Sequence, residues 1–221
     1  MVNLYVAPEW FFGYDFALEF IFAVVTLIVG IYAFKIYKLS NQRQSKLFGI
    51  SFIFFSIAYF IQSLLNIGVI SILEERVVNV NQINLLNAIG FWSIYVHIFL
   101  FLVGLVTLTY MTLKVRSAKV YTLILIISIL SLIFSFNDIY LFYVLASLFL
   151  VFITLHYASN FARHKQKKTL LVLVAFIFLL VGNIHFIFVV NHALFYALGH
   201  ILELVAYVLI LINLIIVWKN G

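Results

Sequence analysis

Ionisable side chains that interrupt long apolar segments are the residues of this sequence that could do chemistry. His200 and Glu203 are three residues apart in one such segment, and Tyr207 continues the same helix face. Glu19 and His97 interrupt two other apolar segments. An ionisable group in an apolar segment costs about 3 kcal/mol unless it faces a partner or a cavity. Each of these side chains is therefore a candidate site residue.

Further polar residues are spaced so that they share helix faces. Gln62 and Asn66 are four residues apart, and His185 shares a face with His192 if that helix continues far enough. If these faces meet, the side chains form one polar pocket. The predicted ligand-binding residues are Glu19, Gln62, Asn66, His97, His185, His200 and Glu203. No catalytic residue is predicted.

Imidazole and carboxylate groups together suit three kinds of site. Histidine nitrogens bind zinc, copper, iron or haem, and three protein ligands with one open position are typical of catalytic zinc. In that interpretation the metal ligands are His97, His185 and His200. Alternatively, the residues line a pocket for a small ligand or a proton, because a buried Glu beside a buried His responds to protonation. The third alternative is a structural network of hydrogen bonds between helices, and the sequence leaves all three open.

The segments that must position these side chains are transmembrane helices. Hydrophobic residues make up 67% of the chain and charged residues 9%, whereas soluble domains have about 25% charged residues. Because each crossing of a bilayer needs about 20 apolar residues, the length of 221 residues allows seven spans and no soluble domain. We predict one all-α seven-helix domain over residues 1–221, with spans at 14–38, 47–72, 86–113, 120–136, 139–160, 170–190 and 193–218. Asn137 and Asp138 mark the break between the fourth and fifth spans, since a single helix there would be too long for a bilayer.

Basic residues are concentrated in alternate connections of these spans. Twelve of the thirteen Lys and Arg residues fall in the first, third and fifth connections or after the last span, and the others hold only Arg76. The positive-inside rule places the basic connections in the cytoplasm, with the N-terminus outside and the C-terminus inside. All seven carboxylates then fall in the outward half. We also expect the aromatic segment 6–12 to lie along the outer interface.

Composition and motifs exclude several classes of function. The chain has no cysteine, which excludes thiolate metal sites, disulfides and thiol redox chemistry. The net charge of +6 comes from short clusters that act as topology signals, so nucleic acid is not an expected partner. The sequence has no nucleophile elbow, phosphate loop or dinucleotide fingerprint, which argues against an enzyme.

The last predicted span contains the stretch YALGHILELVAY, from Tyr196 to Tyr207, and the first ends in a Tyr-Lys-Leu-Ser run. Both resemble the MASE-like group of seven-helix membrane sensor domains, found at the N-terminus of histidine kinases and cyclases, whose last helix has a YH-x-LxLxG/A pattern. The resemblance implies detection of a stimulus in the outer half and transmission through the last helix. The seven-span plan also resembles microbial rhodopsins, whose retinal is attached to a lysine in the last span. The matching stretch 198–213 has no lysine, so retinal is not expected.

These observations lead to one expected function and two alternatives. We expect a sensor or receptor-like binding module of the plasma membrane, without an output domain, that works through a separate cytoplasmic signalling partner or a second copy of the chain. The first alternative is a small-solute or proton-coupled transporter, although the spans contain few polar residues in their inner halves and no helix-breaking proline. The second is a haem- or metal-binding redox protein that uses paired imidazoles, such as His97 with His185 or His200.

Overall fold

A computed structural model describes residues 11, 13–73, 80–189 and 192–219 of the chain. Within these ranges all regular structure is α-helical, apart from a single 3₁₀ residue. The helices are α1 (Tyr14–Ser40), α2 (Arg43–Leu73), α3 (Val80–Leu113), α4 (Ala118–Ile133), α5 (Asp138–His164), α6 (Lys167–Ile187) and α7 (Leu194–Lys219). Six of these helices, all but α4, are long and apolar enough to cross a membrane. The predicted all-α class is confirmed, and each predicted span corresponds to a helix.

The chain turns between α4 and α5 where the sequence predicts a break. Asn137 is the N-cap of α5, and its side-chain oxygen accepts a hydrogen bond from the Tyr140 amide at 3.1 Å. This contact satisfies one of the amide groups that a helix start leaves unpaired. Helix α4 has 16 residues, and a rise of about 1.5 Å per residue makes it about 24 Å long. It is therefore shorter than a bilayer core of about 30 Å.

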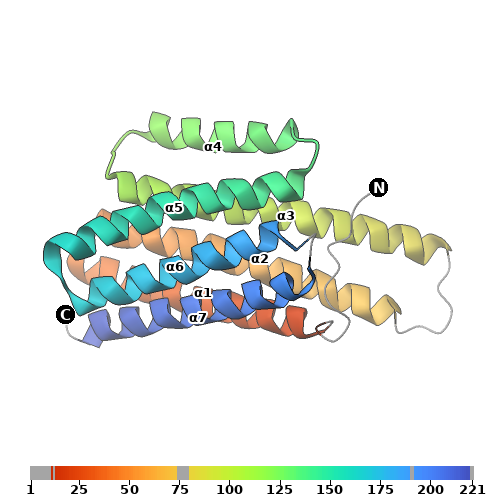
Figure 1. Cartoon of the computed structure of the whole chain (residues 1–221), viewed down its shortest axis with the longest axis horizontal. Coiled ribbons are helices and arrows are strands. Elements are labelled where there is room, and N and C mark those ends of the chain that lie inside the picture. The colour runs from red at the N-terminus through yellow and green to blue at the C-terminus, as the bar shows by residue number, and fades with distance from the viewer. Residues whose placement is uncertain (1–10, 12, 74–79, 190–191, 220–221) are drawn as a thin grey trace.

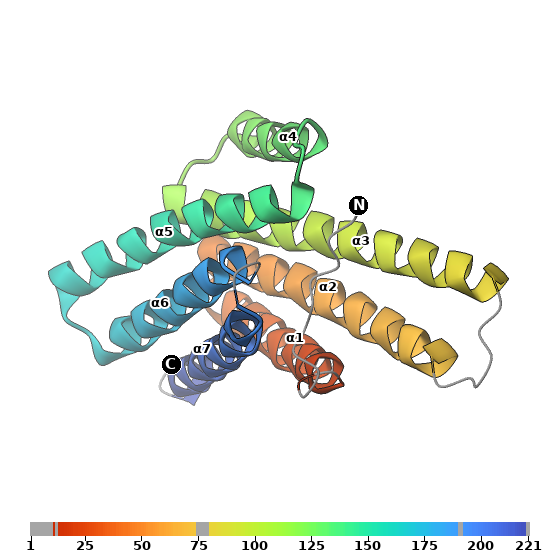
Figure 2. The same cartoon turned by 45° about the vertical axis from the view of Figure 1, so that its right-hand side comes forward.

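The six long helices form a closed ring. Helix α1 packs against α2, α2 against α3, α3 against α5, α5 against α6, α6 against α7, and α7 against α1. Helix α4 contacts α3 and α5 from outside this ring, and both views show it apart from the other helices (Figures 1 and 2). The largest fully buried side chains of the ring include Phe22, Phe52, Phe55, Phe176 and Tyr207. An aromatic core thus holds the helices that carry the polar residues.

Glycines allow two helix pairs of the ring to touch through their backbones. A Cβ on Gly30 of α1 would lie 3.3 Å from the carbonyl oxygen of Gly49 on α2. Similarly, a Cβ on Gly182 of α6 would lie 3.1 Å from the carbonyl oxygen of Gly199 on α7. Small residues at such crossings are typical of membrane helices, whose association depends on close packing. These contacts fix α1 against α2 and α6 against α7.

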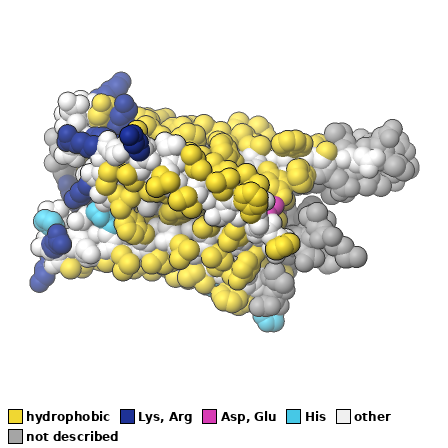
Figure 3. Space-filling model, turned by 90° about the horizontal axis from the view of Figure 1, so that it is seen from above, with side chains coloured by type: hydrophobic (Ala, Val, Ile, Leu, Met, Phe, Trp, Pro, Cys, Tyr) yellow, Lys and Arg dark blue, Asp and Glu magenta, His cyan; other side chains and the backbone are white. Residues whose placement is uncertain are grey.

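The two ends of the bundle differ in charge. Figure 3 shows Lys and Arg side chains gathered at one end and hydrophobic side chains along the length of the bundle. At this basic end, α1, α3, α5 and α7 finish, and α2, α4 and α6 begin (Figure 1). The described carboxylates lie in the first halves of α1, α5 and α7, away from that end: Asp15, Glu19, Asp138 and Glu203. The other charged residues, Glu9, Glu74, Glu75 and Arg76, lie outside the described part of the chain.

Candidate functional site

Polar side chains from four helices converge in the half of the bundle away from the basic end. On each helix they are spaced by three, four or seven residues, so they share one face. Hydrogen bonds and ring contacts between the helices join these side chains. We call this set the polar cluster: Glu19 on α1, Tyr59, Gln62 and Asn66 on α2, Ser93 and His97 on α3, and His200, Glu203 and Tyr207 on α7.

Glu203 lies at the centre of the polar cluster and is only 4% exposed. The Tyr59 hydroxyl donates to its Oε1 at 3.3 Å, and the hydroxyls of Tyr59 and Tyr207 are 2.9 Å apart. On the other side, Nδ1 of His200 lies 3.5 Å from Oε2 of Glu203. Polar contacts are stronger in a buried environment than in water. A change in the charge of Glu203 would therefore affect α2 as well as α7.

A second buried carboxylate, Glu19, joins α1 to α2. It accepts a hydrogen bond from Nδ2 of Asn66 at 2.8 Å. Nearby, the Ser63 hydroxyl donates to the carbonyl oxygen of Phe16 at 3.1 Å. Glu19 and Glu203 are 5% and 4% exposed, so the polar cluster contains two buried carboxylates.

Helix α3 enters the polar cluster through Ser93 and His97. The Ser93 hydroxyl donates to Oε1 of Gln62 at 2.8 Å. The His97 ring packs edge-on against Tyr59 at 5.4 Å between centroids, and its Nδ1 lies 3.4 Å from the carbonyl oxygen of Ala58. The structure therefore brings six of the seven predicted ligand-binding residues into the polar cluster: Glu19, Gln62, Asn66, His97, His200 and Glu203.

Four aromatic rings enclose the imidazole of His200, and we call them the aromatic box. Phe22 and Phe11 stack on it with centroids 5.9 and 6.1 Å away, and Phe186 and Tyr196 approach edge-on at 5.1 and 4.6 Å. Phe11 belongs to the segment 6–12 that we expected along the outer interface, yet its ring is buried in this box. The other residues of that segment lie outside the described ranges.

His200 lacks hydrogen bonds inside this aromatic box. It is 7% exposed, and neither ring nitrogen has a hydrogen-bond partner among the residues that the structure describes. The contact with Glu203 has the distance of an ion pair but not the geometry of a hydrogen bond. Because a buried polar group without a partner costs free energy, His200 is the member of the polar cluster with most to gain from a ligand.

The remaining predicted residue, His185, takes another orientation. Its Nδ1 lies 2.7 Å from the carbonyl oxygen of Val181 on its own helix, and its ring packs edge-on against Phe195 at 5.4 Å. Its neighbour Phe186 faces His200 instead, since consecutive helical residues point about 100° apart. In the described part of the chain, no group of three or more His, Cys, Asp or Glu residues could hold a metal ion. The geometry thus gives no support to the ligand set of His97, His185 and His200, which stays a prediction.

No pattern in the sequence predicts the aromatic box around His200. The chain has 25 phenylalanines, and a ring that faces lipid has the same sequence pattern as a ring that faces a site. Tyr59 was also absent from the predicted ligand-binding residues, although it lies at i−3 from Gln62 on the same face of α2. That spacing was the one available signal for it.

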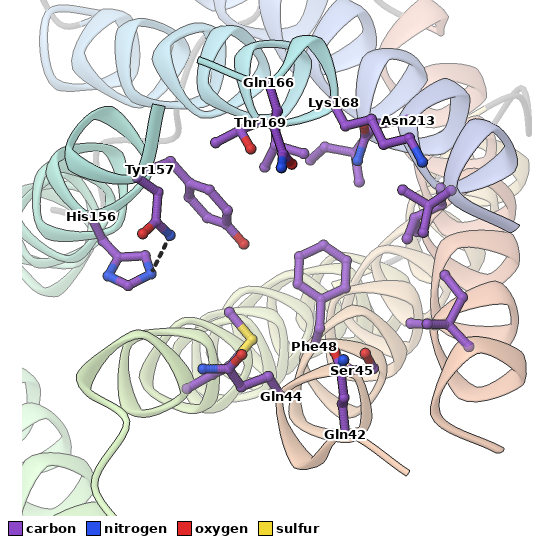
Figure 4. A pocket seen from close by; sticks show the side chains of 18 of the residues that line it. Gln42, Gln44, Ser45, Phe48, His156, Tyr157, Gln166, Lys168, Thr169 and Asn213 are labelled. Atoms are coloured by element: carbon purple, nitrogen blue, oxygen red, sulfur yellow. Dashed lines mark hydrogen bonds between the residues drawn. The ribbon is translucent and has the colours of Figure 1, made fainter. Parts of the chain in front are cut away.

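A separate cavity opens at the basic end of the ring. It has a volume of about 360 Å³ and is lined by all six helices of the ring. Figure 4 shows Ser45 and Phe48 of α2 across an open space from Lys168 and Thr169 of α6. No local pattern in the sequence predicts this cavity, because residues from six helices combine to form it.

Comparisons with protein-family models, with curated proteins and with solved structures found no match to this chain. The resemblance to MASE-like sensor domains therefore stays a prediction from the first and last spans.

Proposed function

We propose that the chain crosses the plasma membrane seven times, with the start of α1 outside and the end of α7 in the cytoplasm. The support is the charge asymmetry, because Lys and Arg gather at one end of the bundle and basic connections stay in the cytoplasm. Helix α4 makes the seventh crossing, since it joins the end of α3 to the start of α5 at the opposite end of the bundle (Figure 1). Local thinning of the bilayer compensates for its short length.

In this orientation the polar cluster is the site of a sensor or receptor-like binding module. A small ligand or a proton enters from outside and acts on His200 and Glu203. The observation that carries the proposal is the imidazole of His200, which is 7% exposed and has no hydrogen-bond partner among the described residues. It also lies 3.5 Å from a carboxylate that contacts α2. Ordinary interhelical hydrogen bonding would not leave that imidazole unpaired.

Helix α7 connects the polar cluster to the basic end. Its buried face includes Glu203, Tyr207, Ile210 and Asn213, each three or four residues from the next. The last two also line the cavity at the basic end. A displacement of α7 at His200 would reach that cavity through one rigid helix. A separate signalling partner or a second copy of the chain would then read the change in the cytoplasm.

The test is thermal unfolding of the detergent-purified protein as a function of pH. We expect the wild-type midpoint to change with pH, by about 3 °C for each kcal/mol that separates the charge states of the buried pair His200 and Glu203. The variants Glu203→Gln and His200→Gln are expected to lose this change, because each removes one partner of the buried pair. His164→Gln is the matched control, since His164 is exposed at the basic end, and it should keep the wild-type profile.

An absorption spectrum and elemental analysis of the same samples separate the alternatives. A Soret band or a stoichiometric metal that disappears in His200→Gln would favour the haem or metal protein. A midpoint that is independent of pH in the wild type, or that changes equally in every variant, would exclude a proton as the signal that acts on this pair. If no small ligand raises the midpoint either, the polar cluster is a structural network.

The cavity favours a transporter as the second candidate, because it places polar groups in the inner half of the bundle. Phe52 of α2 and Tyr207 of the polar cluster pack edge to face, with ring centroids 6.4 Å apart. Each lies about one helical turn from a residue that lines the cavity, Phe48 or Ile210. Phe52 and Tyr207 are 0% and 1% exposed, so transport would require this aromatic contact to open. Liposomes that contain the purified protein distinguish the two functions, since a transporter carries protons or solute across them and a sensor does not.

A further inference from the structure

The cavity at the basic end carries positive charge. Lys114 and Lys168 line it, and none of its described lining residues is Asp or Glu. His156 also lines it, and Nδ2 of Asn160 lies 3.2 Å from its Nε2 (Figure 4). A concave surface with one sign of charge concentrates ions of the opposite sign. The cavity therefore favours an anion.

Two helices begin at this cavity. Helix α2 starts at Arg43 and α6 at Lys167, and the second residue of each, Gln44 and Lys168, lines the cavity. Gln166 precedes α6 without a side-chain capping bond, and its carbonyl oxygen accepts from the amides of Thr169 and Leu170. The amides of Lys167 and Lys168 are the ones left for another acceptor. The start of a helix attracts anions through these amides and through the helix dipole. Both helix starts add to the attraction of the lysines.

Asn213, one of the residues that line the cavity, has a buried amide oxygen without a hydrogen-bond partner among the described residues. Asn213 of α7 is 6% exposed, and within the described ranges its Oδ1 accepts no hydrogen bond. Figure 4 shows Asn213 on the same wall as Lys168 and Thr169. A buried acceptor in this state costs free energy that a hydrogen-bond donor would recover. A ligand that binds both Lys168 and Asn213 therefore carries an anionic group for the lysine and a hydroxyl for the amide oxygen.

The size and the apolar part of the lining define the ligand further. A volume of about 360 Å³ lies near the lower end of the range of about 300–1,000 Å³ for small-molecule sites. The apolar lining residues include Ile36, Phe48, Met111, Val172 and Leu214. An anion with a small organic part suits this combination better than a bare inorganic ion.

We propose that the cavity binds a phosphate ester whose organic part carries hydroxyl groups. Lys168 and the first amides of α6 bind the phosphate, and Oδ1 of Asn213 accepts a hydrogen bond from a hydroxyl. A soluble phosphate ester and the headgroup of a phospholipid both offer this chemistry. The site is independent of the proposed sensor function, because no residue of the polar cluster lines the cavity.

The experiment measures binding to the full-length purified protein in two arms. Isothermal titration with glycerol 3-phosphate, against sulfate at equal ionic strength, tests the soluble source. Thermal unfolding in nanodiscs that contain increasing fractions of phosphatidylglycerol, against phosphatidic acid, whose headgroup has no glycerol hydroxyls, tests the lipid source. We expect saturable binding in at least one arm, and that arm identifies the source. Lys168→Gln should weaken it about tenfold, since it removes a charged hydrogen bond.

Two further variants make the result specific. Lys167→Gln is the matched control, because Lys167 is exposed beside Lys168 and does not line the cavity. Asn213→Leu removes the unpaired oxygen, so it should stabilise the ligand-free protein and weaken binding at the same time. Equal weakening by Lys167→Gln and Lys168→Gln would overturn the proposal, since surface charge alone would then explain binding. Absence of saturable binding in both arms would overturn it as well.

Discussion

Replacement of Gly104 by leucine is expected to destabilise the bundle by about 3 kcal/mol or more, because it overpacks the contact between α2 and α3. A Cβ on Gly104 would lie 2.5 Å from Cε1 of Phe55 and 3.1 Å from the carbonyl oxygen of Ser51. The Phe55 ring is 2% exposed and packs against Phe101 at 4.7 Å between centroids, so it cannot move aside freely. Leucine would force α2 and α3 apart. The polar-cluster residues on α3, Ser93 and His97, would then lie farther from those on α2.

Thermal unfolding followed by tryptophan fluorescence measures this effect. The midpoint of Gly104→Leu should fall by about 10 °C, since 1 kcal/mol corresponds to about 3 °C in a chain of this size. Gly90→Leu is the control on the same helix, because a Cβ on Gly90 would meet nothing within 4 Å, and it should keep the wild-type midpoint. A wild-type midpoint for Gly104→Leu would show that α2 and α3 do not pack in this register.

Replacement of Glu203 by alanine is expected to destabilise the protein by about 2 kcal/mol, from the lost contacts and the space that it leaves. The hydroxyl of Tyr59 would lose the acceptor at 3.3 Å and keep only Tyr207. His200 would lose the carboxylate at 3.5 Å. Glutamine keeps the shape and an acceptor oxygen, so Glu203→Gln should cost about half as much.

The comparison of the two variants separates shape from charge. His185→Ala serves as the control outside the polar cluster, since His185 is half-buried and bonds to its own helix. It should destabilise the protein less than Glu203→Ala does. Equal midpoints for Glu203→Ala and Glu203→Gln would mean that Tyr59 and His200 gain nothing from an acceptor at this position, which would contradict the geometry of the site.

The sequence predicts the helices well because the bilayer constrains them strongly. Apolar length alone separates the spans, and Asn137 gives a capping signal even where α4 and α5 are nearly continuous. Helical periodicity also identifies which residues share a face, as with His200 and Glu203. These features are local, so they need no knowledge of which helices meet.

The site is less predictable because it depends on how each helix is rotated in the ring. His185 and Phe186 are both compatible with an inward position by sequence, and packing against α7 selects Phe186. Phenylalanine carries no signal of its own in a membrane helix, since lipid and protein core are equally apolar. The cavity depends on the order of helices around the ring, which no local pattern in the sequence shows.

The central claim is that the polar cluster lies in the half of the bundle that faces outside. The chain has no cysteine, so single introduced cysteines test this orientation directly. Single cysteines at Ser117 and Phe136 flank α4, and a membrane-impermeant maleimide applied to intact cells reports which side each occupies. We predict that Phe136→Cys is labelled in intact cells and that Ser117→Cys is labelled only after lysis. Labelling of Ser117→Cys in intact cells, or protection of Phe136→Cys until lysis, would contradict the seven-span orientation and the sensor function that depends on it.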